Sequence, residues 1–154
     1  MESVSAALKT CDWSAGRLLH SLIKNGKTAQ MLGEGARLFY ICKNGEMRAF
    51  LTLSRQDCIN DPSLPLWIGF VYTYPAYRNR GYAGRLLNRA VAKAAESGAD
   101  RVYLATDEIG FYERYGFEYA ESRLDVYGNV SRIYFRDCAG ATASGDSDIV
   151  CLSI

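Results

Sequence analysis

The sequence predicts an α/β (α+β) domain with a mixed central sheet, in which parallel and antiparallel strands lie side by side. An apolar run at 66–73 is followed by helical spacing of apolar residues at 83–97 and by a short strand-like segment, Arg101–Thr106. A strand, a helix and a strand in this order form a βαβ unit, whose two strands pair in parallel. Upstream, Asn44-Gly45 separates two strand-like segments and favours a type I′ hairpin, which adds antiparallel pairs.

Apart from the βαβ unit, apolar spacing and turn residues predict one further helix, two β-hairpins and one irregular connection. In chain order these are a helix at 15–24, a hairpin with strands at 37–43 and 46–54, a polar loop at 56–65, and a hairpin with strands at 117–126 and 130–136. We therefore expect the sheet to extend on both sides of the parallel pair.

The chain length and a change in composition predict one domain at 1–137 and a separate tail at 138–154. A chain of 154 residues has the size of a single domain. After Asp137 the sequence consists mainly of small residues up to Asp146, and a short apolar segment ends it. This composition predicts a flexible C-terminal tail.

The overall composition argues against several classes of protein. The formal net charge is only +1, which disfavours general binding to nucleic acids or to a membrane surface. No apolar run reaches the roughly 18–20 residues that cross a bilayer, and the N-terminus lacks a signal-peptide pattern, so we expect a cytoplasmic protein. The 5 cysteines are scattered without a C-x-x-C pair, which predicts reduced thiols and no bound metal.

The connection between the central strand and the next helix has the composition of an anion-binding site. This connection and the first turns of the helix together hold Arg78, Arg80, Arg85 and Arg89 and two glycines. The first N–H groups of a helix have no partner within the helix and lie at the positive end of its dipole. Glycine lets a phosphate approach these groups. A solvated basic face is the alternative, but the glycine spacing and the helix start favour a phosphate or pyrophosphate site.

Two motifs in this region and beyond it carry a family resemblance. The first is Arg78-Asn79-Arg80-Gly81-Tyr82-Ala83, which matches the pattern [RQ]-x-x-G-x-[GA]. The second is Phe111-Tyr112-Glu113-Arg114-Tyr115-Gly116-Phe117, which matches F-Y-x-x-x-G-F. In order and spacing these motifs resemble the acetyl-CoA loop and the later signature of the GCN5-related N-acetyltransferases, the GNAT family. The resemblance covers residues from about 36 to 136.

The resemblance implies a single GNAT-like domain with a central, mixed, twisted sheet of about six or seven strands flanked by helices. It also implies acetyl-CoA as co-substrate, with the pyrophosphate on backbone N–H groups of the loop and the pantetheine arm along the end of the central strand. One backbone amide of this strand end would polarise the thioester carbonyl. The residues expected to bind acetyl-CoA are Val71, Tyr72, Thr73, Arg78, Asn79, Arg80, Gly81, Tyr82, Ala83, Gly84 and Arg85.

The same resemblance makes Tyr112 the candidate general acid that protonates the departing thiolate, although a tyrosine here can also be a wall residue over the cofactor. Many relatives carry a glutamate on the central strand as general base, but 67–72 contains no carboxylate. Asp107 and Glu108 follow the parallel strand and are the nearest substitutes. They can take the proton through water, attract a cationic substrate or cap the helix that holds Tyr112.

We therefore expect an enzyme, an acetyl-CoA-dependent N-acetyltransferase (an acyltransferase) that acts by direct attack of a primary amine in a ternary complex. The alternative is a non-catalytic acyl-CoA-binding domain that serves as a sensor or interaction module. An ATP-binding loop is disfavoured because no lysine follows Gly84. The acceptor is expected to be a small-molecule or peptide amine, and a homodimer that pairs through sheet edges stays open.

Overall fold

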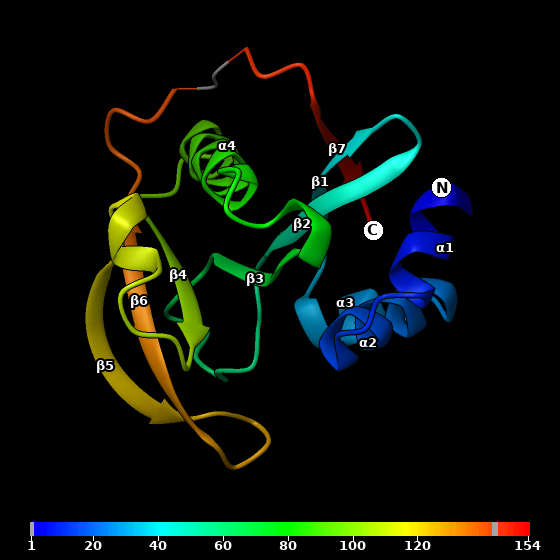
Figure 1. Ribbon diagram of the computed structural model, residues 1–154. Helices are drawn as coiled ribbons and strands as arrows, with labels where there is room; N and C mark the ends of the chain where they lie inside the picture. Colours follow the sequence, from blue (N-terminus) through cyan, green and yellow to red (C-terminus); the bar gives the residue numbers. More distant parts are fainter. Residues whose placement is uncertain (1, 143–144) are drawn as a thin grey trace.

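A computed structural model describes residues 2–142 and 145–154, and within these residues seven strands form one mixed sheet (Figure 1). The strands are β1 Arg37–Lys43, β2 Glu46–Ser54, β3 Trp67–Thr73, β4 Arg101–Thr106, β5 Glu118–Leu124, β6 Val130–Asp137 and β7 Ile149–Ser153. Their order across the sheet is β5-β6-β4-β3-β2-β1-β7. Among these seven described strands, only β3 and β4 pair in parallel. The predicted fold class is confirmed.

Helices cover both faces of this sheet (Figure 1). In the described residues they are the α-helices α1 Glu2–Lys9, α2 Ser14–Lys24, α3 Thr28–Leu32 and α4 Tyr82–Glu96, and the 3-10 helices η1 Pro75–Tyr77 and η2 Tyr112–Tyr115. Helix α4 packs on one face, whereas α1 and α2 contact the other. Helices α1 and α3 fall outside the elements that the sequence predicts. Across the part of the chain described, no helix has the length and apolarity that a membrane span requires.

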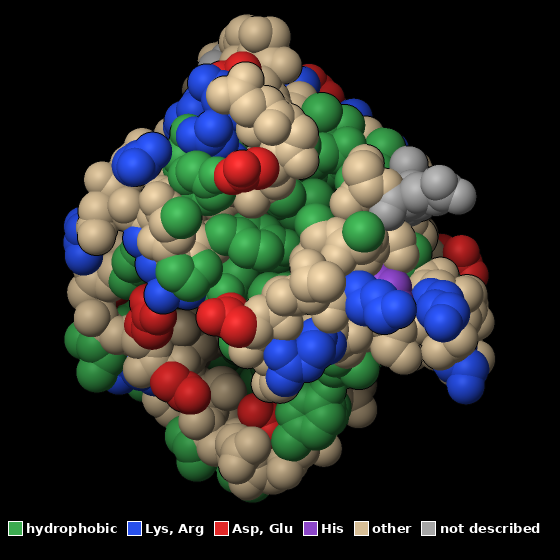
Figure 2. Space-filling model, turned by 45° about the vertical axis from the view of Figure 1, so that its right-hand side comes forward, with side chains coloured by type: hydrophobic (Ala, Val, Ile, Leu, Met, Phe, Trp, Pro, Cys, Tyr) green, Lys and Arg blue, Asp and Glu red, His purple; other side chains and the backbone are tan. Residues whose placement is uncertain are grey.

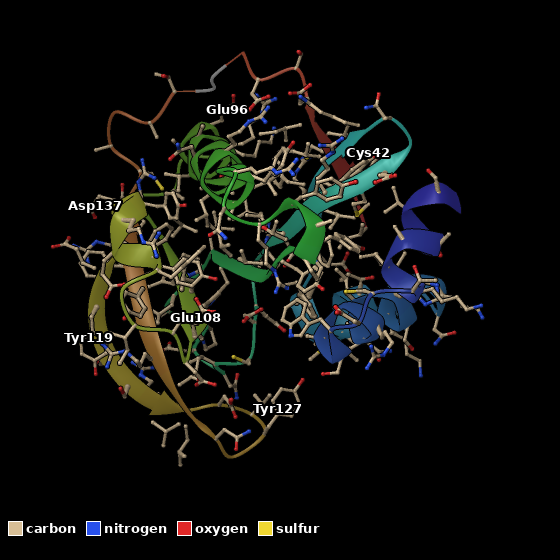
Figure 3. All side chains as sticks on the ribbon, in the orientation of Figure 1. Cys42, Glu96, Glu108, Tyr119, Tyr127 and Asp137 are labelled. Carbon is tan, nitrogen blue, oxygen red and sulfur yellow. The ribbon has the colours of Figure 1, made fainter. Side chains whose placement is uncertain are left out.

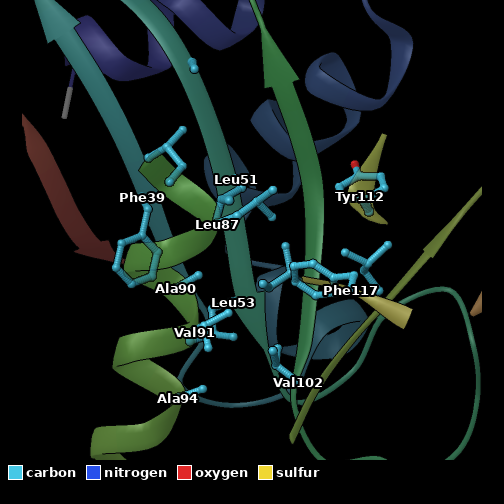
Figure 4. Close-up of a cluster of buried hydrophobic side chains, with 14 of the residues drawn as sticks. Phe39, Leu51, Leu53, Leu87, Ala90, Val91, Ala94, Val102, Tyr112 and Phe117 are labelled. Atoms are coloured by element: carbon cyan, nitrogen blue, oxygen red, sulfur yellow. The ribbon is translucent and has the colours of Figure 1, made fainter. Parts of the chain in front are cut away.

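The main hydrophobic core lies between α4 and the sheet, as Figure 4 shows. Leu87, Ala90 and Val91 of α4 are fully buried against strand residues such as Phe39 and Leu51. Burying one such aliphatic side chain contributes about 1.5–3 kcal/mol to folding. This packing fixes the start of α4 relative to the end of β3, and the candidate site lies between those two points.

The β1–β2 hairpin forms as the sequence predicts. Asn44 has a φ of 54° and Gly45 a φ of 75°, the left-handed conformation that both central residues of a type I′ turn need. The predicted parallel βαβ unit is also present, with α4 between β3 and β4.

Strand β3 contains a bulge that changes the direction of its side chains. Phe70 has a φ of 50°, and the register against β2 shifts at this point. Ile68 and Val71 contact the core under α4, whereas Phe70 joins the cluster under α1 and α2. The bulge therefore breaks the alternation of the strand, as bulges do.

The C-terminal segment differs from the flexible tail that the sequence predicts. Residues Ile149–Ser153 form β7, which pairs with β1 and completes one edge of the sheet (Figure 1). Alternate residues contact the two faces: Ile149 packs with the core under α4, and Leu152 with the cluster under α1 and α2. The short apolar segment is thus stabilised by a partner strand. Residues 1 and 143–144, which belong to the predicted domain and tail, lie outside the described residues.

Candidate active site

Strands β3 and β4 are paired at their start and then separate. Trp67 is opposite Tyr103, and the Tyr103 N–H donates to the Leu66 carbonyl at 3.0 Å. No other register pair joins the two strands in the described residues. Figure 4 shows them diverging, with Tyr112 between them at the open end. The edge of β3 at Val71–Thr73 is therefore left without a strand partner on this side, and an extended ligand can pair with it.

The loop after β3 delivers the N-terminus of α4 to this open end. Gly81 is the N-cap residue of α4, with a φ of 80°, and no side chain caps the helix there. Asn79 is also left-handed, with a φ of 64°. A Cβ added to Gly81 would meet no atom within 4 Å, so backbone conformation is what requires glycine at this position. The uncapped helix start is a suitable site for an anion.

The Arg78 side chain ties the loop back to β3. Its Nε donates to the Thr73 carbonyl at 3.0 Å, and its guanidinium lies 5.5 Å from the centre of the Tyr72 ring. Arg78, Asn79 and Arg80 are all exposed at the surface. These two contacts hold the loop against the end of β3.

Three other residues of the predicted acetyl-CoA set are engaged in packing or ion pairs. A Cβ on Gly84 would lie 2.4 Å from the Tyr115 ring, so this glycine lets η2 pack against α4. Tyr82 is buried in the core. Arg85 forms ion pairs with Asp146 at 2.7 Å and with Asp148 at 2.6 Å. At Tyr82 and Arg85 the side chains are therefore committed to other contacts, and the Arg85 N–H also donates to the Gly81 carbonyl at 3.2 Å.

Tyr112 lies in the core beside the separated strands. Its ring is 8% exposed and packs edge-on against Phe111, with centroids 4.9 Å apart, and against Phe117 at 6.1 Å. Burial, and secondarily the Glu108 carboxylate, raises the pKa of Tyr112 above its ordinary value. The hydroxyl is therefore protonated at neutral pH and can act as a hydrogen-bond donor.

Asp107 and Glu108 are exposed residues after β4 (Glu108 is labelled in Figure 3). Glu108 is close enough to Tyr112 to influence its pKa. Neither carboxylate caps η2, because its N-cap residue, Phe111, has no side-chain partner there. Instead, Glu113 accepts a hydrogen bond from the Gly110 N–H at 3.0 Å. The structure thus brings Glu108 towards Tyr112 but leaves both predicted bases in solvent.

A cavity of about 460 Å³, which we call the α2–β3 pocket, lies beside the β3 bulge. Its walls come from the start of α2, from α3, from Phe70 and from the loop between β5 and β6, where Tyr127 lies (Figure 3). Hydrophobic side chains gather in a hollow near the centre of the face drawn in Figure 2, with acidic side chains at its border. The walls of the pocket include Trp13, Leu18, Met31, Asp57, Phe70 and Tyr127.

Two pocket residues, Asp57 and Cys58, were not among the predicted site residues. Burial, and secondarily the Asp57 and Asp125 carboxylates, raises the pKa of Cys58 to about 12. Its reactive thiolate is therefore negligible at neutral pH, and Cys58 is unsuited to carry an acetyl group. Burial also raises the pKa of Asp57 from 3.8 to about 6. The sequence signal that points to Asp57 is indirect. The central strand contains no carboxylate, and Asp57 lies in the loop that precedes this strand.

A wider depression of about 1160 Å³ also borders Asp57, but it extends to the C-terminal end of α4 at Ser97 and Gly98. The loop from Arg78 to Arg85 starts the same helix at its other end. Because only the α2–β3 pocket includes a residue of the β3 bulge, we take it as the pocket that belongs to the candidate site.

Comparisons with known structures identify the same fold in bacterial proteins. A GNAT-family protein from Desulfovibrio desulfuricans is 16% identical, covers 90% of this chain and 92% of its own, and has a TM-score of 0.67. Aminoglycoside 6′-acetyltransferase type Ii is 15% identical, with 89% and 88% covered and a TM-score of 0.63. The N-acetyltransferase YhbS from Escherichia coli, crystallised with CoA, is 21% identical, with 92% and 81% covered and a TM-score of 0.62. These identities support the fold alone.

Sequence comparison supplies the family. No curated protein matches the chain. The family model described as acetyltransferase (GNAT) family matches residues 8–117, which include β3, the loop after it, α4 and η2. Since this match spans more than half of the 154 residues, the chain belongs to the GNAT acetyltransferase family.

Proposed function

We propose that this protein transfers the acetyl group of acetyl-CoA to a primary amine, by direct attack in a ternary complex. The observation that carries the proposal is the meeting of an unpaired β3 edge with the uncapped N-terminus of α4. An extended arm that ends in a pyrophosphate has the shape and charge to use both at once. Membership of the acetyltransferase family supports the same co-substrate.

The residues present fit acetyl-CoA. Backbone N–H groups from Arg80 to Gly84 would hold the pyrophosphate, because the helix start has no side-chain cap and Gly81 exposes it. The N–H of Arg85, which the sequence places in the same set, instead donates to the Gly81 carbonyl at 3.2 Å. The β3 edge from Val71 to Thr73 would pair with the pantetheine arm. One amide of this edge would polarise the thioester carbonyl, a contribution of roughly 3 kcal/mol in other enzymes.

Tyr112 would protonate the departing thiolate, since it lies between the diverging strands and its hydroxyl stays protonated at neutral pH. Direct attack is favoured over an acetyl-enzyme because Cys58, the pocket thiol, has a pKa of about 12. Asp107 and Glu108 stay predictions for the base: both are exposed, and neither lines the α2–β3 pocket.

The acceptor class is proposed from the pocket and from the relatives. Two structural neighbours are named as aminoglycoside 6′- and nourseothricin acetyltransferases. A pocket of about 460 Å³ has the volume of a small-molecule site. A small amine is therefore the first acceptor to test, and a peptide amine the second.

Thermal unfolding with acetyl-CoA, ATP and NAD tests the co-substrate. A ligand at one hundred times its Kd stabilises a protein by about 2.7 kcal/mol. For a domain of this size that should raise Tm by roughly 5–10 °C, and we expect it with acetyl-CoA alone. A shift with ATP or NAD of the same size, or none with acetyl-CoA, would contradict the proposal.

The second test separates catalysis from binding. Thiol release from acetyl-CoA is followed with a panel of primary amines. A melting shift accompanied by acceptor-dependent thiol release supports the transferase. A shift without release for any amine would favour the alternative, a non-catalytic acyl-CoA-binding domain.

A further inference from the structure

We propose that Asp57 and the aromatic walls of the α2–β3 pocket bind the ammonium group of the acceptor, and that Asp57 takes the proton this group must lose before attack. The inference rests on the proposed function and deepens it by naming the chemical class of the acceptor and the base.

The first observation is where the Asp57 carboxylate lies. A Cβ built on Gly69 would be 2.4 Å from Asp57 Oδ1, so the carboxylate occupies the space that a side chain on β3 would fill. The buried Thr52 Oγ1 lies 3.3 Å from the same point, and it has no hydrogen-bond partner among the residues described. A polar group of β2, beside Gly69 of β3, is thus left for a ligand or water to satisfy.

The second observation is the β3 bulge. Gly69 contacts Asp57, and the next residue, Phe70, lines the α2–β3 pocket. Val71 follows and begins the strand edge proposed to hold the thioester. Two residues of strand span roughly 7 Å. An amine bound near Asp57 can therefore move to that edge to attack, and its proton can pass to Asp57 through one water.

The third observation concerns charge. Asp57 is the single charged residue among the described residues that line the pocket. The titratable groups that face it in this pocket are Cys58 on its own loop and Tyr127 on the β5–β6 loop, with Asp125 behind them. The wider depression that also borders Asp57 carries charges of both signs, from Arg37, Arg55, Lys93, Glu34, Glu96 and Asp61. α2, α3 and β3 contribute only uncharged side chains to the pocket. Burial raises the pKa of Asp57 to about 6 although hydrogen bonds with Cys58 lower it, and no cationic side chain lines the described part of this pocket.

A ligand ammonium is the group that would complete this arrangement. It would supply the opposite charge that the buried carboxylate lacks. The aromatic walls add to the preference, because ring faces attract cations. Trp13 stacks on Tyr72 with centroids 5.3 Å apart and meets Phe70 edge-on at 6.4 Å, so this wall is built from mutually supported rings. An alcohol would leave the charge uncompensated, and the pocket should discriminate against it.

The Asp57 loop is held in place by the β5–β6 hairpin. The Val126 N–H donates to the Cys58 carbonyl at 2.8 Å, and Arg123 pairs with Asp61 at 2.5 Å. Both contacts lie on the C-terminal side of Asp57, and on its N-terminal side the Gln56 N–H donates to the Leu32 carbonyl at 3.1 Å. The carboxylate is therefore positioned before any ligand arrives, as a binding site requires.

The proton and bond changes balance. One proton of the ammonium passes to the Asp57 carboxylate, and the freed nitrogen lone pair forms the C–N bond as the C–S bond breaks. The thiolate takes the Tyr112 proton, and the second amine proton restores the Tyr112 hydroxyl. Asp57 then releases its proton to solvent. The products are the amide, CoA thiol and one proton.

Calorimetric titration with n-butylammonium chloride tests the binding half, with n-butanol and potassium chloride as controls. Above pH 7 we expect butylammonium to bind the wild type at least tenfold more tightly than it binds Asp57→Asn. Gly69→Ala, whose new Cβ displaces the carboxylate without removing it, should weaken binding in the same direction. Asp100→Asn, an exposed carboxylate outside the pocket, is the matched control. Equal binding to wild type and Asp57→Asn, or no binding beyond potassium chloride, overturns the inference.

The pH dependence of kcat/KM, measured with an acceptor from the thiol-release panel, tests the base. The wild type should lose activity below about pH 6, and Asp57→Asn should have a low kcat/KM without that limb. If Asp107→Asn or Glu108→Gln removes the limb instead, Asp57 is not the base. Every variant is first melted with acetyl-CoA. A missing shift in the wild type refutes the proposed function, whereas a normal shift with unchanged butylammonium binding refutes only the Asp57 assignment.

Discussion

Replacing Asp57 by Asn should stabilise the folded protein at neutral pH and leave its stability in acid unchanged. In the native state the carboxyl group lies among protein atoms beside Gly69, and no cation neutralises it. The unfolded chain hydrates the same group fully. Ionisation therefore costs more in the folded state than in the unfolded state, and the amide of Asn avoids that cost.

The size and sign follow from the pKa. A rise from 3.8 to about 6 corresponds to about 3 kcal/mol. Because the folded pKa lies above the unfolded one, the stabilising contribution of protonated Asp57 is complete below pH 3.8 and is lost as pH rises through about 6. The difference in unfolding free energy between Asp57→Asn and wild type should thus grow from near zero at pH 3.8 to about 3 kcal/mol above pH 7.

Urea unfolding of both proteins between pH 3.5 and about 8 measures this difference. Carboxyl groups whose pKa is lowered in the folded protein, such as Asp61 beside Ser63 and Arg123, increase the stability as pH rises. They contribute equally to both proteins, so this effect cancels in the difference between Asp57→Asn and wild type. The same measurement on Asp100→Asn, an exposed carboxylate outside the pocket, is the control for replacing any carboxylate by an amide. If the curves for Asp57→Asn and wild type run parallel across this range, the carboxylate is solvated or paired, and the reasoning about its burial fails.

Four further residues give separate predictions. Gly81→Asp puts an anion at the start of α4 on a φ of 80° and should abolish the acetyl-CoA melting shift; an unchanged shift removes the pyrophosphate assignment. Tyr112→Phe should lower kcat by up to about a hundredfold while the melting shift stays, and full turnover would exclude the general-acid role. Gly84→Ala should cost about 1–3 kcal/mol in urea unfolding, because its Cβ would lie 2.4 Å from the Tyr115 ring. Arg85→Met, which breaks the pairs with the C-terminal carboxylates, should cost about 1 kcal/mol, and this loss should shrink in high salt.

The elements that the sequence predicted well are those with local causes. The Asn44-Gly45 turn needs only its own backbone preference, and the bounds of both hairpin strands agree with the structure. The parallel unit follows from the order of its elements, and the motif loop sits where the resemblance expects it. The family match then confirms the assignment that these motifs support.

The features that the sequence did not reveal depend on distant partners. Strand β7 is short and is stabilised by pairing with β1, which lies more than one hundred residues earlier in the sequence. Asp57 lies in a loop whose composition predicts only irregular structure. Its approach to Gly69 requires the bulge at Phe70 and the contacts of the loop with the β5–β6 hairpin. No local pattern encodes such a juxtaposition.

The missing carboxylate of β3 and the glycine at its bulge are two aspects of one arrangement. A side chain at Gly69 would collide with Asp57, so a strand that carried its own base here could not also accept a carboxylate from the loop. The Asp57 carboxylate lies on a loop instead of on β3, and that loop is held by the same β5–β6 hairpin that supplies Tyr127 to the pocket. The position of the proposed base, Asp57, and the position of one wall of the acceptor site, Tyr127, therefore both depend on the β5–β6 hairpin. Substitutions at the Arg123–Asp61 pair, which touches neither the pocket nor the co-substrate loop, should consequently change KM for the amine more than the affinity for acetyl-CoA.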